Sequence, residues 1–317
     1  MHSIQSGKSN NMQQVTVRAH ASIANLVCGF DILGMSLEEP FDEMQLELTN
    51  EPGIVIRHTD SYGLSEDPVK NVAGVALQAM IDETDSTVGV LCTIQKNIKP
   101  GSGLGSSAAS AAGAVAALNR LLGDQFPITD LVRFAMSGEK LASGVKHADN
   151  ISPCLYGGIT LIRSIHPLDI VSLNFPPLFI TVVHPQVEVK TSDARQILRK
   201  QVLLKDAIKQ WGNIAGLVTG LNTCDAALIG RSLEDVIIEP VRSILIPAFH
   251  EIKKASMNSG ALGGGIAGSG PSIFMLSNEL QTASAIELVM NTIYDRIGLD
   301  CKTYVTKVNP KGITFIS

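Results

Sequence analysis

The first residues that could do chemistry lie at positions 101–110, where the sequence reads GSGLGSSAAS. Three glycines at alternate positions allow positive φ angles and let the backbone come close to a ligand. The apolar, β-branched run at 88–96 predicts a buried strand, and the alanine-rich run at 106–122 predicts a helix. Unpaired N–H groups and the helix dipole at such a junction favour an anion. We therefore predict a phosphate-binding loop, although no GK[ST] follows the glycines as in a Walker A loop.

Three further segments concentrate glycine, polar and charged residues between apolar stretches. Asn25 and Asp31 flank a Cys-Gly turn within residues 21–35, and a His-Ala-Asp-Asn run opens residues 147–158. A turn or a helix cap explains a single Asn or Asp, but not all three polar residues of that run. In residues 260–276, six glycines precede a predicted strand, so they form either a tight turn or a close backbone approach to another group.

The composition limits the class of protein. The chain has 317 residues, 45% hydrophobic and 17% charged, which is enough for two globular domains or one large one. Its net charge is −5, its pI is about 5.8 and no basic patch stands out, so we expect no nucleic-acid partner. No apolar run approaches the roughly 20 residues that span a bilayer, so we expect no membrane association. Five scattered cysteines without CxxC spacing and a polar N-terminus predict a reduced, cytoplasmic protein.

The predicted elements alternate without regular βαβ winding, which favours an α+β fold with two layers and two lobes. Residues 1–13 are predicted to be a disordered tail. The NFPPL stretch at 174–178 breaks any regular element, so we predict two domains, 14–174 and 175–317. Thr129 is the predicted N-cap of one helix. Strands are predicted at 14–20, 44–49, 54–58, 88–96, 158–164, 178–184, 272–277 and 301–307, and helices at 71–82, 106–122, 129–143, 191–200, 203–224, 240–259 and 279–297.

The polar segments together resemble a known family. ASIANLVCGFDILGM from residue 21, PGSGLGSSAAS from residue 100 and GIAGSGPSIFML from residue 265 are similar to the three motifs of the GHMP kinase superfamily, in the same order. The resemblance implies a two-lobed fold with an N-terminal domain like ribosomal protein S5 and a C-terminal ferredoxin-like α/β sandwich. Among the branches, homoserine kinases are the most similar, by the runs Ala24-Asn25-Leu26, Gly29-Phe30-Asp31, His147-Ala148-Asp149-Asn150 with Pro153 and Gly157-Gly158, Lys190-Thr191 with Ala194-Arg195, and Glu239-Pro240-Val241-Arg242.

The resemblance implies ATP and Mg²⁺. Backbone N–H groups of the glycine loop and the helix start would hold the phosphates, and magnesium takes few protein oxygens. A hydroxyl from Ser107, or from Ser106, and the carboxylate of Glu139 would be the metal ligands, whereas the helical pattern alone would also suit Glu139 on a solvated face. The residues that the resemblance assigns to ATP are Pro100, Gly101, Ser102, Gly103, Leu104, Gly105, Ser106, Ser107 and Gly268.

The implied acceptor is L-homoserine, a zwitterion with a free hydroxyl. A planar guanidinium suits its carboxylate, and oxygen acceptors suit its ammonium group. Arg195 and Arg242 fit the first task and Asp31 with Asn25 the second. His147 and Asp149 would either orient the hydroxyl or complete the ammonium site. The implied substrate-binding residues are Asn25, Asp31, His147, Asp149, Thr191, Arg195 and Arg242.

Asn150 stands where several relatives in the superfamily use Asp as a general base. An amide cannot accept a proton at neutral pH, and the loose transition state of phosphoryl transfer lets positioning and charge neutralisation supply most of the catalysis. The resemblance therefore implies a homoserine O-phosphotransferase of threonine biosynthesis without a dedicated protein base, with Asn150, Glu139 and Ser107 as catalytic residues. A mevalonate-type sibling kinase and a non-catalytic member of the fold stay open as alternatives. The resemblance also implies a homodimer.

Overall fold

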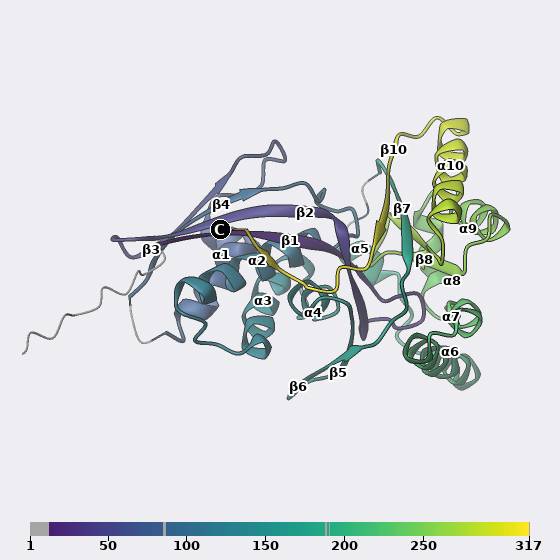
Figure 1. Cartoon of the computed structure of the whole chain (residues 1–317), viewed down its shortest axis with the longest axis horizontal. Helices are drawn as coiled ribbons and strands as arrows, with labels where there is room; N and C mark the ends of the chain where they lie inside the picture. The colour runs from purple at the N-terminus through teal and green to yellow at the C-terminus, as the bar shows by residue number, and fades with distance from the viewer. Residues whose placement is uncertain (1–12, 85–86, 188, 190, 317) are drawn as a thin grey trace, which may run out of the picture.

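Two β-sheets and the helices packed on them make up the fold, which the computed structural model describes for residues 13–84, 87–187, 189 and 191–316 (Figure 1). Residues 1–12 of the predicted tail lie outside this part of the chain. The described strands are β1 (Gln14–Ala24), β2 (Leu33–Thr49), β3 (Gly53–His58), β4 (Gly89–Gln95), β5 (Ile159–Ile165), β6 (Leu168–Leu173), β7 (Phe179–Pro185), β8 (Gly263–Ile266), β9 (Ile273–Ser277), β10 (Cys301–Lys307) and β11 (Thr314–Phe315).

The two sheets divide the strands between the lobes, with one exception. The larger sheet has the order β11-β1-β2-β4-β3, with β5 paired to β2 and β6 paired to β5, and the smaller has the order β10-β7-β9-β8. Neighbouring strands are antiparallel except for β3 and β4, which are parallel. The exception is β11, because the end of the chain returns to pair with β1. The predicted division between residues 174 and 175 stays a prediction. The end of the chain crosses it, both at β11 and at the bridge between Leu37 and Val308.

The helices cover one face of the larger sheet and flank the smaller one (Figure 1). Helices α1, α2 and α4 pack against the larger sheet, α3 packs on these three helices, and α10 lies across β7, β9 and β10. Among the described residues the helices are α1 (Val72–Ile81), α2 (Ser106–Leu121), α3 (Ile128–Ser143), α4 (Ile151–Tyr156), α5 (Thr191–Gln196), α6 (Leu204–Thr223), α7 (Ala226–Ser232), α8 (Glu239–Arg242), α9 (Phe249–Asn258) and α10 (Leu280–Arg296), with 3₁₀ turns at Pro68–Lys70 and Ser243–Leu245.

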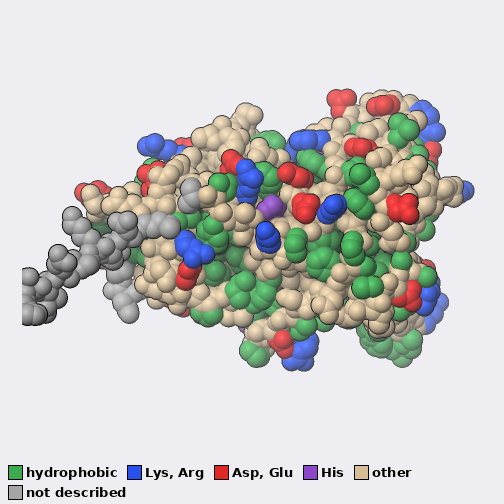
Figure 2. All heavy atoms as spheres, viewed as in Figure 1, with side chains coloured by type: hydrophobic (Ala, Val, Ile, Leu, Met, Phe, Trp, Pro, Cys, Tyr) green, Lys and Arg blue, Asp and Glu red, His purple; other side chains and the backbone are tan. Residues whose placement is uncertain are grey.

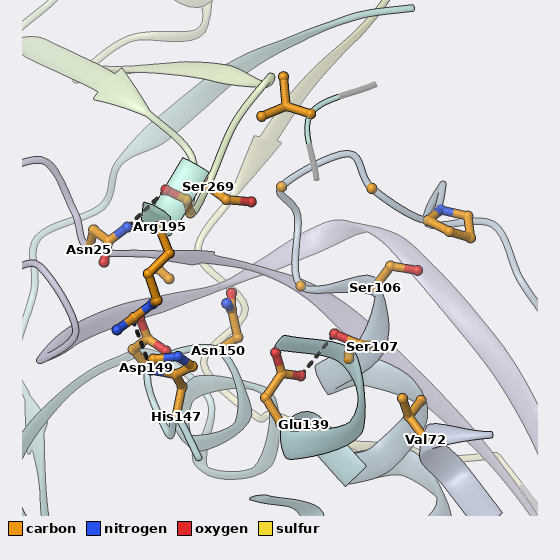
Figure 3. Close-up of a pocket in the computed structure, with 18 of the residues that line it drawn as sticks. Asn25, Val72, Ser106, Ser107, Glu139, His147, Asp149, Asn150, Arg195 and Ser269 are labelled. Carbon is orange, nitrogen blue, oxygen red and sulfur yellow. Dashed lines mark hydrogen bonds between the residues drawn. The ribbon is translucent and has the colours of Figure 1, made fainter. Parts of the chain in front are cut away.

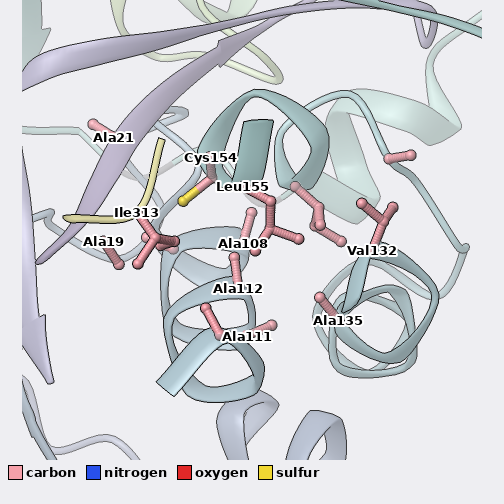
Figure 4. Close-up of a cluster of buried hydrophobic side chains, with 14 of the residues drawn as sticks. Ala19, Ala21, Ala108, Ala111, Ala112, Val132, Ala135, Cys154, Leu155 and Ile313 are labelled. Atoms are coloured by element: carbon pink, nitrogen blue, oxygen red, sulfur yellow. The ribbon is translucent and has the colours of Figure 1, made fainter. Parts of the chain in front are cut away.

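Helix α2 is the centre of the larger core. Its alanines are almost all buried, and their small side chains let β1, α3 and α4 approach the helix closely (Figure 4). Ala19 of β1, Val132 of α3 and Leu155 of α4 meet Ala108 and its neighbours there. A helix so enclosed holds its first turn in a fixed place, and that first turn directly follows the glycine loop.

The predicted α+β class in two lobes is confirmed, and most predicted elements exist near their expected bounds. The helix predicted at 240–259 is wrong: it is broken into α8, a 3₁₀ turn and α9, because Pro247 cannot continue a helix and Ala248 has a φ of 57°. Thr129 is not the N-cap of α3, since Pro127 occupies that position. Strands β6, β8 and β11 were not predicted.

The surface of the described residues mixes charges of both signs. Figure 2 shows acidic and basic side chains interspersed over one face of the molecule, with apolar side chains between them. Several exposed ion pairs, such as Arg163 with Asp169, contribute to this pattern. Within the described part of the chain, no helix is long and apolar enough to pass through a bilayer.

Candidate active site

A pocket of about 440 Å³ gathers residues from all four polar segments and from both lobes (Figure 3). One side of its wall consists mostly of the glycine backbone before α2. The other side is charged and includes residues of α5 and α8. The residues predicted from the sequence that line it are Asn25, Asp31, Pro100, Gly101, Gly103, Gly105, Ser106, Ser107, Glu139, His147, Asp149, Asn150, Arg195, Arg242 and Gly268.

The glycine loop lies directly against the second glycine-rich segment. Gly103 has a φ of 81°, and a Cβ placed there would lie 2.6 Å from the carbonyl oxygens of Ala267 and Gly270. Gly268 has a φ of 57°, and a Cβ there would lie 2.9 Å from the oxygen of Gly103. The two loops therefore pack backbone to backbone, which only residues without a side chain permit. Ser272 closes the contact by donating from both its N–H and its Oγ to the oxygen of Ser102.

A buried lysine holds the two ends of the glycine loop together. Lys96 directly follows β4 and is 3% exposed. Its Nζ donates to the carboxylate of Asp42, to the backbone oxygen of Ser106 and to Oγ of Ser110. Asp42 in turn accepts the N–H groups of Asn97 and Ile98. These bonds tie the residues before the loop to the first turn of α2.

The side chains of three residues predicted to bind ATP are directed into the protein. Ser106 donates its hydroxyl to the oxygen of Ile98, 2.8 Å away. Ser102 and Leu104 are 1% exposed and lie outside the pocket wall, and the N–H of Leu104 donates to Oγ of Ser102. Any contact of Ser102 or Leu104 with a phosphate would thus involve the backbone, and the hydroxyl of Ser106 is already engaged.

Ser107 and Glu139 form a pair of oxygen groups beside the loop. Oγ of Ser107 donates to Oε2 of Glu139 over 2.8 Å, and both residues face the pocket (Figure 3). Burial of the Glu139 side chain raises the pKa of its carboxyl to about 7, against the lowering effect of the Ser107 hydrogen bond. A buried carboxylate that is costly to ionise gains from a nearby cation, and hard oxygen ligands suit Mg²⁺. The described residues hold no cluster of three or more His, Cys, Asp or Glu that could bind a metal.

The charged side of the pocket joins side chains that are distant in the sequence. Nη2 of Arg195 donates to both carboxylate oxygens of Asp31 at 2.8 Å. The same nitrogen lies 3.4 Å from Nδ1 of His147. Nδ1 of His147 also lies 3.6 Å from Oδ1 of Asp31, so the ring faces both partners of this ion pair. The pKa of His147 is lowered, mainly by burial and further by Arg195 and Arg242, while Asp31 acts to raise it.

Arg242 is the buried member of the arginine pair. It is 4% exposed and donates to the carbonyl oxygens of Ala194 and Gly268. Burial lowers its pKa to about 10, so it stays charged at neutral pH. Phe30 lies close to both arginines, with its ring centroid 5.0 Å from the guanidinium carbon of Arg242 and 5.5 Å from that of Arg195. The aromatic ring thus supports both cations on the same side of the pocket.

A left-handed turn places Asp31. Asn25, Leu26 and Val27 have φ angles of 75°, 41° and 67°, which are strained for residues other than glycine. Oδ1 of Asn25 accepts the N–H of Asp31, and Nδ2 of Asn25 donates to the oxygen of Gly268. Asn25 therefore joins the turn to the second glycine segment and orients the carboxylate of Asp31.

Two polar residues of the His-Ala-Asp-Asn run lie between the two sides of the pocket. Asp149 is 4% exposed, and burial raises the pKa of its carboxyl to about 7, with smaller contributions from Asp31 and Glu139. Asn150 precedes α4 but makes no capping bond; its Oδ1 accepts the hydroxyl of Ser22 instead. Figure 3 shows Asn150 between Asp149 and Glu139.

Two family models match the chain. "GHMP kinases N terminal domain" matches residues 70–158 and "GHMP kinases C terminal" matches residues 217–296. A homoserine kinase of Chloroherpeton thalassium is 44% identical over 95% of this chain and 99% of its own length. The chain belongs to the GHMP kinase family.

Solved structures agree with this membership. A crystal structure of homoserine kinase from Cytophaga hutchinsonii is 45% identical, covers 100% of both chains and has a TM-score of 0.92. A mevalonate kinase from L. major in complex with R-mevalonate is 16% identical over 96% of each chain with a TM-score of 0.68, which shows the shared fold alone. The GHMP kinase resemblance predicted from the motifs is thus confirmed.

Several wall residues of this GHMP kinase were not predicted from the sequence. Among them are the polar residues Lys96 and Ser110 and the aromatic Phe30, although the motif that contains Phe30 was recognised. A lysine that ends a buried strand just before a glycine loop was the available signal for Lys96. The side chain of Thr191 and the whole of Lys190 lie outside the described residues, so the predicted role of Thr191 stays a prediction.

Proposed function

We propose that this protein is a homoserine kinase, which transfers the γ-phosphoryl group of ATP to the side-chain hydroxyl of L-homoserine. The observation that carries the proposal is one pocket with a backbone phosphate cradle on one side and the Asp31, Arg195 and Arg242 set on the other. The relatives named homoserine kinase, similar along nearly the whole chain, support the same acceptor.

The nucleotide would lie along the glycine loop. Positive φ angles at Gly101, Gly103 and Gly105 turn the loop, and helix α2 begins at its end, where anions are favoured. Leu64, Val72 and the ring of Pro100 form an apolar part of the wall that would suit a nucleobase. The loop is held in place from both ends by the Lys96 bonds and by the Gly268 segment.

Binding of the acceptor would break the ion pair between Asp31 and Arg195, and each of the two residues would then pair with a charged group of the substrate. Without substrate, Asp31 and Arg195 bind each other. The ammonium group of homoserine would take the place of Arg195 at Asp31, and its carboxylate would bind Arg195 and Arg242. An acceptor without an ammonium group, such as mevalonate, would draw Arg195 away from Asp31 and supply no cation to replace it. This requirement selects an amino acid.

Phosphoryl transfer would proceed without a protein base. The hydroxyl oxygen of homoserine forms a bond to the γ-phosphorus while the bond from that phosphorus to the β-γ bridging oxygen breaks, and ADP leaves. Asn150, beside Glu139 and Asp149, would orient the hydroxyl, and its proton would pass to an oxygen of the transferred phosphoryl group. The carboxyl of Asp149 lies in the same wall and would orient the ammonium or hydroxyl end.

Ser107 and Glu139 are the residues that would hold Mg²⁺. Their oxygens are 2.8 Å apart, face the pocket and are of the hard type that this ion prefers, so they fit it. When bound, the ion would neutralise charge on the phosphates of ATP. Ser107 is the better of the two serine candidates, because the hydroxyl of Ser106 is directed to Ile98.

The proposal is tested by coupled ADP release with ATP and four acceptors: L-homoserine, mevalonate, galactose and 4-hydroxybutyrate. The last has the hydroxyl and carboxylate of homoserine but no ammonium group. We expect turnover with homoserine and a kcat/KM at least about 100-fold lower with 4-hydroxybutyrate, since a charged partner of Asp31 is lost. A homoserine rate no better than that of the other acceptors would refute the substrate assignment.

Three further expectations belong to this proposal, the first from the family resemblance and the other two from the sequence itself. They are a homodimer, a cytoplasmic location and the division into domains 14–174 and 175–317. Sedimentation equilibrium of the purified chain, which gives its mass in solution, tests the first of them.

A further inference from the structure

Ser22 of β1 connects the glycine loop to Asn150 without lining the pocket itself. It is 0% exposed, its N–H donates to the oxygen of Leu104 over 3.1 Å, and its Oγ donates to Oδ1 of Asn150 over 2.9 Å. A Cβ at Gly105 would lie 2.1 Å from that Oγ, so the loop packs directly on the serine. Ser22 and Asn150 are 128 positions apart in the sequence.

The hydrogen bond from Ser22 decides which way the amide of Asn150 faces. A buried hydroxyl needs an acceptor for its hydrogen, and among the described residues Oδ1 of Asn150 is the acceptor that Ser22 has. If the amide were turned over, Nδ2 would face Ser22 and the hydroxyl would lose this acceptor. The bond therefore directs Oδ1 to Ser22 and leaves Nδ2, a donor, on the pocket side.

We propose that Ser22 is a positioning residue that fixes the amide of Asn150 with its N–H₂ group toward the acceptor hydroxyl. The inference rests on the proposed function and adds a direction to the role of Asn150. Nδ2 then donates to one lone pair of the hydroxyl oxygen, and the other lone pair attacks phosphorus. The hydroxyl hydrogen is left to point at the phosphoryl group, to which it passes as the oxygen–phosphorus bond forms and ADP leaves.

The opposite amide orientation would give a different geometry. Oδ1 facing the pocket would accept the hydroxyl hydrogen and hold it away from the phosphoryl oxygens, and it could not take the proton at neutral pH. Fixing the donor face therefore matters for a site that has an amide where a base could stand. Loss of the Ser22 hydroxyl would let both orientations occur.

The test is a double-mutant cycle with Ser22→Ala, Asn150→Ala and the double variant, measured as kcat and KM for both substrates. We expect Ser22→Ala to lower kcat about tenfold, the value of one hydrogen bond, with KM for ATP little changed. In the Asn150→Ala background the same change should leave kcat unaltered, because Ser22 acts through that amide. Ser152→Ala is the matched control, since Ser152 is a fully buried serine on α4 whose hydroxyl has no partner among the described residues.

Multiplicative losses of kcat in the double variant, or a rise in KM for ATP that persists without Asn150, would overturn the inference, because both indicate that Ser22 only supports the loop. Ser22→Cys replaces the hydroxyl with a slightly larger thiol that donates only weakly, and it covers the case in which Ser22→Ala does not fold. It should lower kcat while leaving KM for ATP unchanged, and an unaltered kcat would also overturn the inference. A wild-type chain that does not phosphorylate homoserine refutes the proposed function instead.

Discussion

The proposed phosphate end and the proposed acceptor end of the pocket are built by different means. At the phosphate end, two glycine segments pack backbone to backbone, and a Cβ at Gly103 would lie 2.6 Å from two carbonyl oxygens. At the acceptor end, the side chains of Asp31, Arg195 and His147 meet across the two lobes, and Asp31 and Arg195 are about one-third exposed. The first region is part of the packed interior, whereas the second is an ion pair that a substrate would open under the proposed function.

This difference indicates which region contributes to folding stability and which to substrate specificity. Backbone packing has little freedom, so a change at the phosphate end should alter folding and nucleotide binding together. A partly exposed ion pair contributes little to folding, but its charges can be exchanged for those of a ligand. Changes at the acceptor end should therefore affect substrate binding with little loss of stability. The predictions below test this contrast.

The largest effect is expected from Gly103→Ala at the phosphate end. The new methyl group meets two backbone oxygens and must also adopt a φ of 81°. The overpacking and the left-handed backbone together should lower the free energy of unfolding by about 3 kcal/mol or more. Urea denaturation measures this quantity.

Gly101→Ala is the matched control for Gly103. Gly101 has a similar φ of 74°, but a Cβ there would meet nothing within 4 Å. It should therefore lose only the cost of the backbone conformation, about 1–2 kcal/mol. Equal losses in the two variants would show that the phosphate end is not held by close backbone packing.

A smaller effect, confined to substrate binding, is expected from Asp31→Asn. The amide keeps the shape of the carboxylate but cannot pair with the ammonium group of homoserine. We expect KM for homoserine to rise about 100-fold, with KM for ATP unchanged and an unfolding free energy within about 1 kcal/mol of wild type. Steady-state kinetics and urea denaturation provide these values.

Asp169→Asn is the matched control for Asp31→Asn, because it removes a similar carboxylate charge outside the pocket. Asp169 is 34% exposed, as Asp31 is, and it also pairs with an arginine, but it lies on β6 away from the pocket wall. Both KM values should stay at their wild-type level in this variant. A stability loss in Asp31→Asn as large as that of Gly103→Ala would remove the contrast between the two ends.

The same contrast explains what the sequence could predict. The glycine loop was predictable because positive φ angles and a helix start are local requirements that a short run of residues shows by itself. The break in the predicted helix 240–259 was also visible locally, since Pro247 lies in its interior.

The acceptor end required information from other proteins. The Asp31–Arg195 bond joins residues 164 positions apart, and the Asn25–Gly268 bond joins residues 243 positions apart. No local pattern specifies such pairs, so only the family resemblance brought these residues together. Ser22 was missed because it looks like an ordinary strand residue until its partners are known, whereas the position of Lys96 before the glycine loop was a signal that went unused.

The smallest predicted effect concerns Glu139, which lies where the two ends meet. Its buried carboxyl has a pKa raised from 4.5 to about 7, so the folded protein without ligands binds a proton that the unfolded chain releases. This contribution to stability is fully present below about pH 4.5 and is lost as the pH rises through 7. Between pH 6 and pH 8 it should amount to a loss of about 1 kcal/mol in the free energy of unfolding.

Glu139→Gln should remove this loss, because a neutral amide does not titrate. Wild type and variant are compared by urea denaturation at pH 6 and pH 8 without nucleotide or metal, so that other titrating groups cancel in the difference. The variant should therefore gain on wild type at the higher pH. Glu83→Gln is the control, since Arg133 lowers the pKa of that exposed carboxyl and leaves it ionised across the whole range.

Parallel pH dependence in wild type and Glu139→Gln would mean that the carboxyl of Glu139 is already ionised at pH 6. The site beside Ser107 would then carry a full negative charge before any cation arrives, and the phosphate end would share the charged character of the acceptor end.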